Sequence, residues 1–238
     1  MQFDVSPAAR WKPTAIRVEV RRGNGSTRLR WIAGLVVCMG LYGCRDADKS
    51  PSELERQQKF WNETYREPRT FPPSAFLIEM VEHLKPGRAL DIAMGQGRNS
   101  LYLASRGWRV TGIDISDEGI RQARAAAASR KLTIETLLKD VDTWDHGRAQ
   151  WDLVLLIYAG DDMAKVRRSL KPGGLVVSER FHSDANPRIG TTPAEFAKRY
   201  GEGFDILRNE VVSEVSVWGN RHHDPTKVVH FAARKRAQ

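Results

Sequence analysis

The segment from Arg88 to Ser116 constrains the fold of this chain more than any other part of the sequence. The apolar run 89–92 is followed by a loop with Gly95 and Gly97, and a helix-like stretch then leads to a second apolar run, 110–113. Glycines at these positions let the backbone turn tightly and let a ligand approach without meeting a Cβ atom. The order strand, glycine loop, helix, strand predicts a nucleoside-binding edge of a parallel sheet.

Two carboxylates bracket the glycine loop, and they distinguish between the nucleoside ligands that such a loop can hold. Asp114 ends the second apolar run, where a carboxylate can accept hydrogen bonds from ribose hydroxyls. The helix that starts near Arg98 directs backbone N–H groups at the loop, which favours an anionic ligand group there. Asp91 would repel a pyrophosphate but attract an ammonium group. S-adenosyl-L-methionine carries a ribose, a carboxylate and an ammonium, so the pattern favours this cofactor over NAD.

The dinucleotide fingerprint is also incomplete in this loop. The fingerprint G-x-G-x-x-G requires a glycine or alanine at its sixth place, and the sixth residue here is Ser100. An NAD-dependent oxidoreductase therefore stays an alternative hypothesis rather than the leading one.

Apolar, β-prone runs alternate with helix-like stretches through the rest of the chain. Such alternation predicts a doubly wound α/β fold, in which helices cover both faces of a parallel sheet. The run 151–158 is almost continuously apolar, which is typical of a strand buried on both faces. The expected strands are 132–138, 151–158 and 175–181, the expected helices are 117–130 and 161–170, and a helix stop with a turn is expected at 170–174.

Residues 91–97 (Asp-Ile-Ala-Met-Gly-Gln-Gly) resemble the first motif of class I S-adenosylmethionine-dependent methyltransferases, acid-x-Gly-x-Gly-x-Gly, with Ala93 in the first glycine place. The run 97–104 further resembles the small-molecule branch that includes tellurite-resistance and thiopurine methyltransferases. The resemblance covers the chain from about Glu53 to Lys235. It implies methyl transfer from S-adenosyl-L-methionine to a small-molecule acceptor.

The same resemblance implies a Rossmann-like, seven-stranded, mostly parallel sheet. Its closing antiparallel hairpin would comprise residues 207–218 and 227–233. The implied cofactor site consists of Asp91, Ala93, Gly95, Gly97 and Asn99 in the first motif, Asp114 and Ile115 after the second strand, Asp140 and Val141 after the third, Tyr158 after the fourth, and Trp61 and Tyr65 upstream.

Within this set, the resemblance places Asp140 and the Val141 N–H at the adenine ring edge, Ile115 on the purine face, and Tyr158 facing the sulfonium. Three of the positions also have a plain structural explanation. Asp140 suits a turn after a strand, Tyr158 suits an aromatic at the edge of the core, and Asn99 suits a helix start.

Residues 51–66 are predicted to form a helix with a capping box at Ser52 and Glu55. By the resemblance, Trp61 and Tyr65 belong to an N-terminal lid over the cofactor. The alternative is an amphipathic helix that packs on the domain through these aromatic rings. A second helix is expected over 74–84, leading into the first strand.

No catalytic residue and no metal site is predicted. A sulfonium is already an activated leaving group, so alignment of the acceptor, methyl carbon and sulfur can supply much of the acceleration. An amine or hydroxyl acceptor would also need a base. Glu179 and His182 near the fifth strand and His222, His223 and Asp224 in the hairpin loop are the candidates, and none has a partner recognisable in the sequence.

Residues 1–50 are expected to be disordered around a signal-like apolar stretch at 31–44, and residues 51–238 to form the methyltransferase domain. The stretch ends in a sequence similar to a bacterial lipoprotein signal with Cys44 as the lipidated residue, and it is short for a membrane span. Because S-adenosylmethionine is a cytosolic metabolite, the catalytic domain is expected in the cytoplasm. A membrane tether through 31–44 and a segment never used as a signal both stay open.

The charge distribution and the positions of the cysteines restrict the partners and the kinds of site that are expected for the domain. The formal net charge is +9, but basic residues are mixed with acidic ones and no nucleic-acid motif accompanies them. No nucleic-acid partner is therefore expected.

Both cysteines, Cys38 and Cys44, precede the predicted domain, which excludes a disulfide or thiolate site within it. A non-catalytic, membrane-tethered nucleoside-binding protein is the second alternative, and neither the acceptor nor the oligomeric state is predicted.

Overall fold

The computed structural model describes residues 52–160, 162–215 and 225–237. The signal-like stretch 31–44 and Cys44 lie outside these residues, so the tether and the division of the chain at residue 50 stay predictions. Among the described residues, no helix combines the length and the apolar character needed to cross a membrane.

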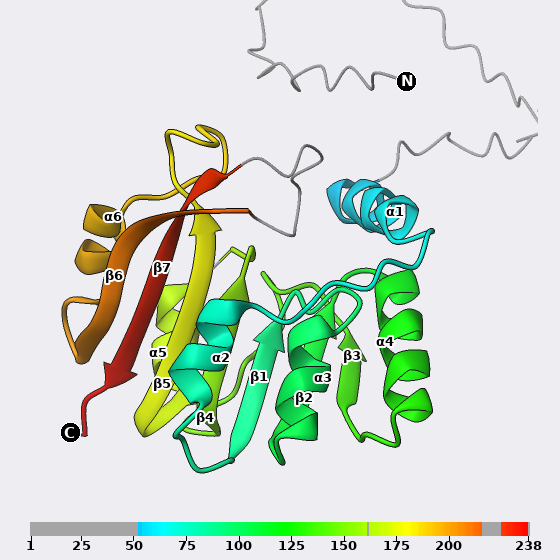
Figure 1. Ribbon diagram of the computed structural model, residues 1–238, viewed down its shortest axis with the longest axis horizontal. Helices are drawn as coiled ribbons and strands as arrows, with labels where there is room; N and C mark the ends of the chain where they lie inside the picture. The colour runs from blue at the N-terminus through cyan, green and yellow to red at the C-terminus, as the bar shows by residue number, and fades with distance from the viewer. Residues whose placement is uncertain (1–51, 161, 216–224, 238) are drawn as a thin grey trace, which may run out of the picture. The chain divides into compact units, whose positions relative to one another are not determined.

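A seven-stranded sheet forms the framework of the domain, in the order β3-β2-β1-β4-β5-β7-β6 (Figure 1). The first five strands run parallel, and β7 lies antiparallel to both β5 and β6. The predicted fold class is thereby confirmed, including the closing hairpin. The strands are β1 (Arg88–Ile92), β2 (Arg109–Asp114), β3 (Glu135–Leu138), β4 (Trp151–Ile157), β5 (Leu170–Phe181), β6 (Phe204–Glu214) and β7 (Thr226–Lys235).

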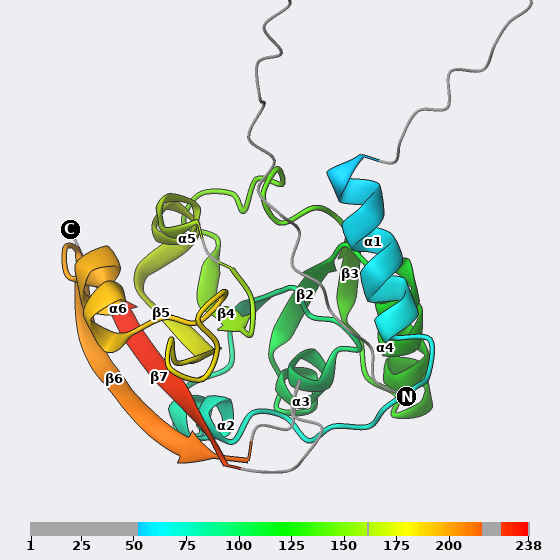
Figure 2. The ribbon, with the colours of Figure 1, turned by 90° about the horizontal axis from the view of Figure 1, so that it is seen from above.

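Helices cover both faces of this sheet (Figure 2). The helices are α1 (Glu53–Thr64), α2 (Ala75–Val81), α3 (Arg98–Ser105), α4 (Asp117–Ser129), α5 (Met163–Ser169) and α6 (Pro193–Tyr200). Because successive side chains of a strand point to opposite faces, each central strand contributes to two cores. Val154 and Leu156 of β4 pack in the core that contains residues of α5 and α6, whereas Leu153 and Leu155 pack with residues of α2 and α3.

Polar caps define where several helices begin. The capping box predicted at Ser52 and Glu55 is present at the start of α1, and Ser116 caps α4. Helix α6 was not predicted, although its start carries a second capping box, formed by Thr192 and Glu195. Phe196 and Tyr200 are fully buried at helical spacing, so the signal for α6 was present in the sequence.

Several predicted boundaries differ from the structure: β3 begins at Glu135, where 132 was expected, and α2 ends at Val81, where 84 was expected. The expected turn at 170–174 lies within β5, because Leu170 pairs with Trp151 and pairing resumes where Leu175 meets Leu153. The predicted helix stop is confirmed, because α5 ends at Ser169 with Leu170 as its C-cap, but the residues that follow form a bulge within β5 instead of a turn before a separate strand. The first strand of the closing hairpin begins at Phe204 and ends at Glu214, whereas residues 207–218 were expected, of which 216–218 lie outside the described part.

The strand order creates a switch point at the centre of the sheet. From β1 the chain proceeds to β2 and β3 in one direction, and β4 and β5 then lie on the other side of β1. Loops that follow β1 and β4 therefore diverge at their carboxyl ends, which opens a crevice there. The glycine loop follows β1 and thus lies at this crevice.

Candidate functional site

The glycine loop connects β1 to α3 through a series of left-handed backbone conformations. Ala93, Gly95 and Gly97 have φ angles of 56°, 54° and 78°. A Cβ atom at Gly95 would lie 2.6 Å from the Tyr65 hydroxyl, and one at Gly97 would lie 2.9 Å from the Cβ atom of Ala123. Ala93 adopts the conformation at a cost of about 1–2 kcal/mol. The alanine that departs from the family motif therefore still takes the glycine-like backbone shape.

Asp114, at the end of β2, holds this loop in place. Its Oδ2 atom accepts a hydrogen bond from the Gly95 N–H at 2.7 Å, and its Oδ1 atom accepts one from the Ser116 N–H at 2.7 Å. Burial raises the pKa of the Asp114 carboxyl, and these backbone donors counteract that rise. Each carboxylate oxygen can accept a further hydrogen bond, so the predicted ribose contact remains chemically available.

Asp91 is the buried carboxylate beneath the loop. The side chain accepts a hydrogen bond from the Ser100 hydroxyl at 2.6 Å. Burial raises its pKa to about 6, against the opposing effects of this hydrogen bond and of Arg98. A buried carboxylate with a raised pKa favours a cationic partner, because the partner would compensate the desolvated negative charge.

A cavity of about 450 Å³ opens over the loop, a size suited to a small organic ligand. Of the predicted site residues, the five on its wall are Tyr65, Asp91, Ala93, Gly95 and Asn99. The other predicted site residues are not on this wall: Gly97, Asp114, Ile115, Asp140, Val141, Tyr158 and Trp61. The structure thus brings the first-motif residues together in one cavity and leaves the residues predicted to hold the adenine outside it.

The Tyr65 side chain packs against the glycine loop at Gly95. Its ring stacks on Trp61 with 5.9 Å between ring centroids, and burial raises the pKa of its hydroxyl. Asn62 fastens α1 to α4, because its Oδ1 atom accepts from the Ser116 hydroxyl at 2.6 Å and its Nδ2 atom donates to Asp117 at 2.5 Å. Helix α1 therefore packs on the domain, as the amphipathic interpretation expected, and its role as a lid over the cofactor stays a prediction.

The residues after β3 and β4 have local structural roles. Asp140 accepts a hydrogen bond from the Asp142 N–H at 2.9 Å, which is the turn-forming arrangement considered from the sequence. Tyr158 has a φ of 57°, and its ring lies 5.0 Å from that of Phe181. Val141 and Ile115 are half-buried. Their contacts with a cofactor stay predictions.

The segment 67–73 was missed as part of the site. Pro68, Arg69, Thr70, Phe71 and Pro73 all line the cavity. The Arg98 guanidinium donates to the Pro72 carbonyl at 3.2 Å and so holds this segment across the start of α3. Three prolines in seven residues were the available signal, since proline favours an extended chain after a helix.

The structure describes two of the candidate bases, Glu179 and His182, and their surroundings differ. Glu179 is buried, and its carboxylate accepts from the Ser74 hydroxyl at 2.6 Å. The Ser74 N–H in turn donates to Asn99 at 3.0 Å, which links Glu179 to the cavity wall. His182 is engaged in a local turn, where its Nδ1 atom accepts from the Asp184 N–H. His222, His223 and Asp224 lie outside the described residues.

Comparisons with known proteins agree with this geometry. Residues 89–174 match a family described as "Methyltransferase domain". The chain is 33% identical over 66 residues to the probable S-adenosyl-L-methionine-dependent methyltransferase TehB of Haemophilus influenzae, covering 28% of this chain and 23% of that protein. It is 37% identical over 59 residues to a 23S rRNA (uracil(747)-C(5))-methyltransferase of Pyrococcus abyssi, covering 24% of this chain and 14% of that protein.

These alignments span a quarter or less of the length of either relative. A solved structure of TehB from Haemophilus influenzae superposes with a TM-score of 0.60 at 17% sequence identity, covering 76% of this chain and 67% of that one. At this identity the superposition establishes the shared fold.

Proposed function

We propose that this chain, a class I S-adenosylmethionine-dependent methyltransferase by sequence motif and by fold, transfers a methyl group to a small-molecule acceptor. The observation that carries the proposal is the placement of buried Asp91 and the left-handed glycine loop on one cavity at the switch point of the sheet. The loop admits a close ligand approach, and the carboxylate favours an ammonium group. Asp91 is the feature that separates this cofactor from a dinucleotide, because its carboxylate would repel a pyrophosphate.

Each chemical group of the cofactor has a proposed partner in the chain. Asp91 would hold the ammonium, and the N–H groups at the start of α3 would hold the carboxylate. Asp114 would accept from the ribose, next to Tyr65, whose hydroxyl lies close to Gly95. Asp140, Val141 and Ile115 would hold the adenine, and Tyr158 would face the sulfur. When bound, the cofactor supplies a methyl group on an activated sulfonium, and the chain supplies alignment.

A small acceptor is supported by the size of the cavity. The volume of about 450 Å³ is that of a site for a small organic molecule. The basic residues of the chain are mixed with acidic ones, which does not favour a groove for nucleic acid. Thiols, metalloid oxyanions, amines and carboxylates are the acceptor classes that we propose to test.

The test combines binding with turnover. Calorimetry should show that S-adenosyl-L-homocysteine binds and that NAD does not. Labelled S-adenosyl-L-methionine should then transfer its methyl group to at least one of the four acceptor classes. Binding of NAD alone would favour the oxidoreductase hypothesis, and cofactor binding without turnover on the whole panel would favour a non-catalytic nucleoside-binding protein.

The tether through residues 31–44 remains part of the proposal for the full chain. Mass spectrometry of the native N-terminus tests it directly. A protein that starts at lipid-modified Cys44 would establish export, and an unprocessed N-terminus would remove the lipid anchor.

A further inference from the structure

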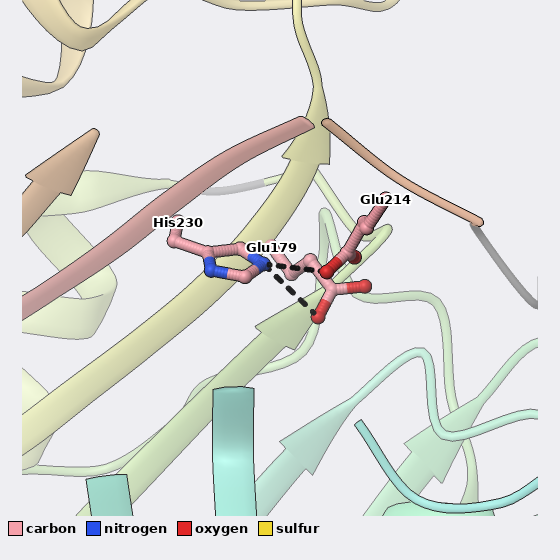
Figure 3. Close-up of side chains that lie close together, drawn as sticks. All are labelled: Glu179, Glu214 and His230. Carbon is pink, nitrogen blue, oxygen red and sulfur yellow. Dashed lines mark ion pairs between the residues drawn. The ribbon is translucent and has the colours of Figure 1, made fainter. Parts of the chain in front are cut away.

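We propose that Glu179, Glu214 and His230 form a binding site for a divalent transition-metal ion such as Mn²⁺ or Zn²⁺. The three side chains come from β5, β6 and β7 and converge near the carboxyl end of β5 (Figure 3). None of the three residues is a proposed cofactor contact, although Ser74 connects Glu179 to Asn99, and the inference does not depend on the proposed function.

The distances between the donor atoms suit one shared ion. The His230 Nε2 atom lies 3.5 Å from a Glu214 carboxylate oxygen and 3.9 Å from a Glu179 carboxylate oxygen. One donor atom from each residue lies within 4.8 Å of the other two. Three donors bound tetrahedrally to one ion at about 2.1 Å lie about 3.4 Å apart. Small side-chain rotations are therefore enough to close the site around an ion.

His230 provides the second, independent observation. The residue is only 9% exposed, and its Nε2 atom has no hydrogen-bond partner within the described part of the chain. Leaving a buried polar atom unsatisfied costs about 1–3 kcal/mol. The ring is also held in place, because it stacks on Phe76 with 4.2 Å between centroids and 11° between planes. An unsatisfied donor atom is thus fixed in a direction that faces two carboxylates.

The charge of the cluster favours a cation as well. Glu179 is buried, and across residues 52–160, 162–215 and 225–237 neither Glu179 nor Glu214 pairs with a lysine or arginine. Two carboxylates this close together repel each other unless a positive charge lies between them. A divalent ion would compensate both charges, whereas the single histidine can compensate at most one.

The orientation of Glu179 is fixed by a neighbouring side chain. The Ser74 hydroxyl donates to its Oε2 atom at 2.6 Å. Outer hydrogen bonds of this kind commonly orient carboxylate ligands of metal ions. Glu214 is more accessible, with 33% of its side chain exposed, so water can complete the coordination.

The donor set narrows the identity of the ion. One imidazole nitrogen and two carboxylate oxygens suit Zn²⁺ and Mn²⁺. Mg²⁺ and Ca²⁺ prefer oxygen donors alone. Soft ions such as Cu⁺ prefer the thiolate or thioether ligands that this cluster lacks.

The test is calorimetric titration of the tag-free full chain with MnCl₂, without any cofactor. Mn²⁺ is the first probe because Cys38 and Cys44 could bind Zn²⁺ independently. We expect one Mn²⁺ per chain in the wild type and a loss of affinity of at least about tenfold in Glu214→Gln and in His230→Gln. Asp205→Asn is the matched control, since it removes an exposed carboxylate from the same strand, β6.

Each outcome of these titrations either supports the metal site or overturns it. Absence of Mn²⁺ binding in the wild type, or equal affinity in the wild type and both site variants, overturns the site. Equal weakening by Asp205→Asn overturns it too, because the effect would then be one of general surface charge. Circular dichroism of each variant establishes that it is folded, and Glu214→Gln is the variant that disturbs the core least because Glu214 is partly exposed.

A parallel titration with S-adenosyl-L-homocysteine keeps the two proposals apart. We expect Glu214→Gln to bind this ligand as the wild type does. A wild type that binds Mn²⁺ but no S-adenosyl-L-homocysteine would contradict the proposed function and leave the metal site intact.

Discussion

At the scale of single residues, the chemistry of the proposed cofactor site depends on Asp91. The carboxylate is buried, has a pKa of about 6, and lies on the cavity wall. Asn99 and Gly95 shape the same wall, but they carry no charge. Arg69, Arg98 and Arg130 lie on the same wall, so Asp91 is the acidic residue of this wall that can pair with an ammonium group.

Asp91→Asn should weaken binding of S-adenosyl-L-homocysteine by about 10- to 100-fold, since it removes a charge-assisted hydrogen bond but keeps the size of the side chain. In the wild type, affinity should fall as pH decreases below about 6, because protonation neutralises the carboxylate. Calorimetry from pH 5 to pH 8 measures both effects. Glu82→Gln, at an exposed position after α2, is the control and should bind as the wild type does.

The same pKa shift also predicts a change in stability. The carboxyl titrates at about 6 in the folded protein and near its ordinary value of 3.8 when unfolded. Between these two values the folded state binds more protons, so the contribution of Asp91 to stability falls as pH rises through this window. Asp91→Asn should therefore be at least as stable as the wild type at pH 7. A marked loss of stability in this variant would mean that Asp91 serves the fold rather than a ligand.

Gly95→Ala tests the loop backbone. The φ of 54° costs an alanine about 1–2 kcal/mol, and the new Cβ atom would lie 2.6 Å from the Tyr65 hydroxyl. We expect a loss of about 1–2 kcal/mol in the free energy of unfolding, measured by urea denaturation, because Tyr65 can move aside. Gly160→Ala is the matched control: a Cβ atom there meets nothing within 4 Å, and we expect a change below about 0.5 kcal/mol.

At the scale of elements, α1 is the helix whose attachment bears most directly on access to the site. It contacts α4 and carries Tyr65, its C-cap residue, over the glycine loop. The described residues of α1 include no fully buried side chain. The helix therefore depends on polar contacts, chiefly those of Asn62, more than on core packing.

Asn62→Ala should release α1 from α4. The substitution removes the hydrogen bonds to Ser116 and Asp117, which we expect to be worth about 1–2 kcal/mol together. Hydrogen exchange of the α1 amides should accelerate by roughly 5- to 30-fold, while exchange in β1 and β4 stays unchanged. Lys59→Ala, at an exposed position of the same helix, should leave the exchange rates as they are.

At the scale of the whole molecule, the antiparallel hairpin is integrated into the core rather than attached at its edge. Phe231 of β7 is fully buried and stacks on Phe196 of α6 with 4.5 Å between centroids. Tyr200 packs against the same ring at 4.8 Å. The aromatic cluster joins α6 and the hairpin to the parallel part of the sheet.

Phe231→Ala should therefore destabilise the entire domain by about 3–5 kcal/mol, the usual cost of removing a fully buried aromatic ring. Thermal or urea unfolding monitored by circular dichroism measures the effect. The control is Val211→Ala on β6, where the side chain is 42% exposed and the expected loss is below about 1 kcal/mol. Similar losses in the two variants would contradict the assignment of Phe231 to the core.

The sequence by itself determined the elements whose signals are local. The strand, glycine loop, helix and strand from β1 to β2 appear where they were predicted, because apolar alternation, glycine backbone freedom and helix caps act over a few residues. The capping box of α1 and the buried run of β4 were equally readable. The first-motif residues of the site, Asp91 and Gly95 among them, followed directly from this unit.

Only the tertiary structure decided what depends on contacts between distant segments. The bulge in β5 follows from its pairing with β4, and the position of Tyr65 over Gly95 follows from the docking of α1. Glu179, Glu214 and His230 lie far apart in the chain and follow no ligand spacing. They converge because β7 pairs with both β5 and β6, and strand pairing of this kind is set by long-range packing that no local residue pattern encodes.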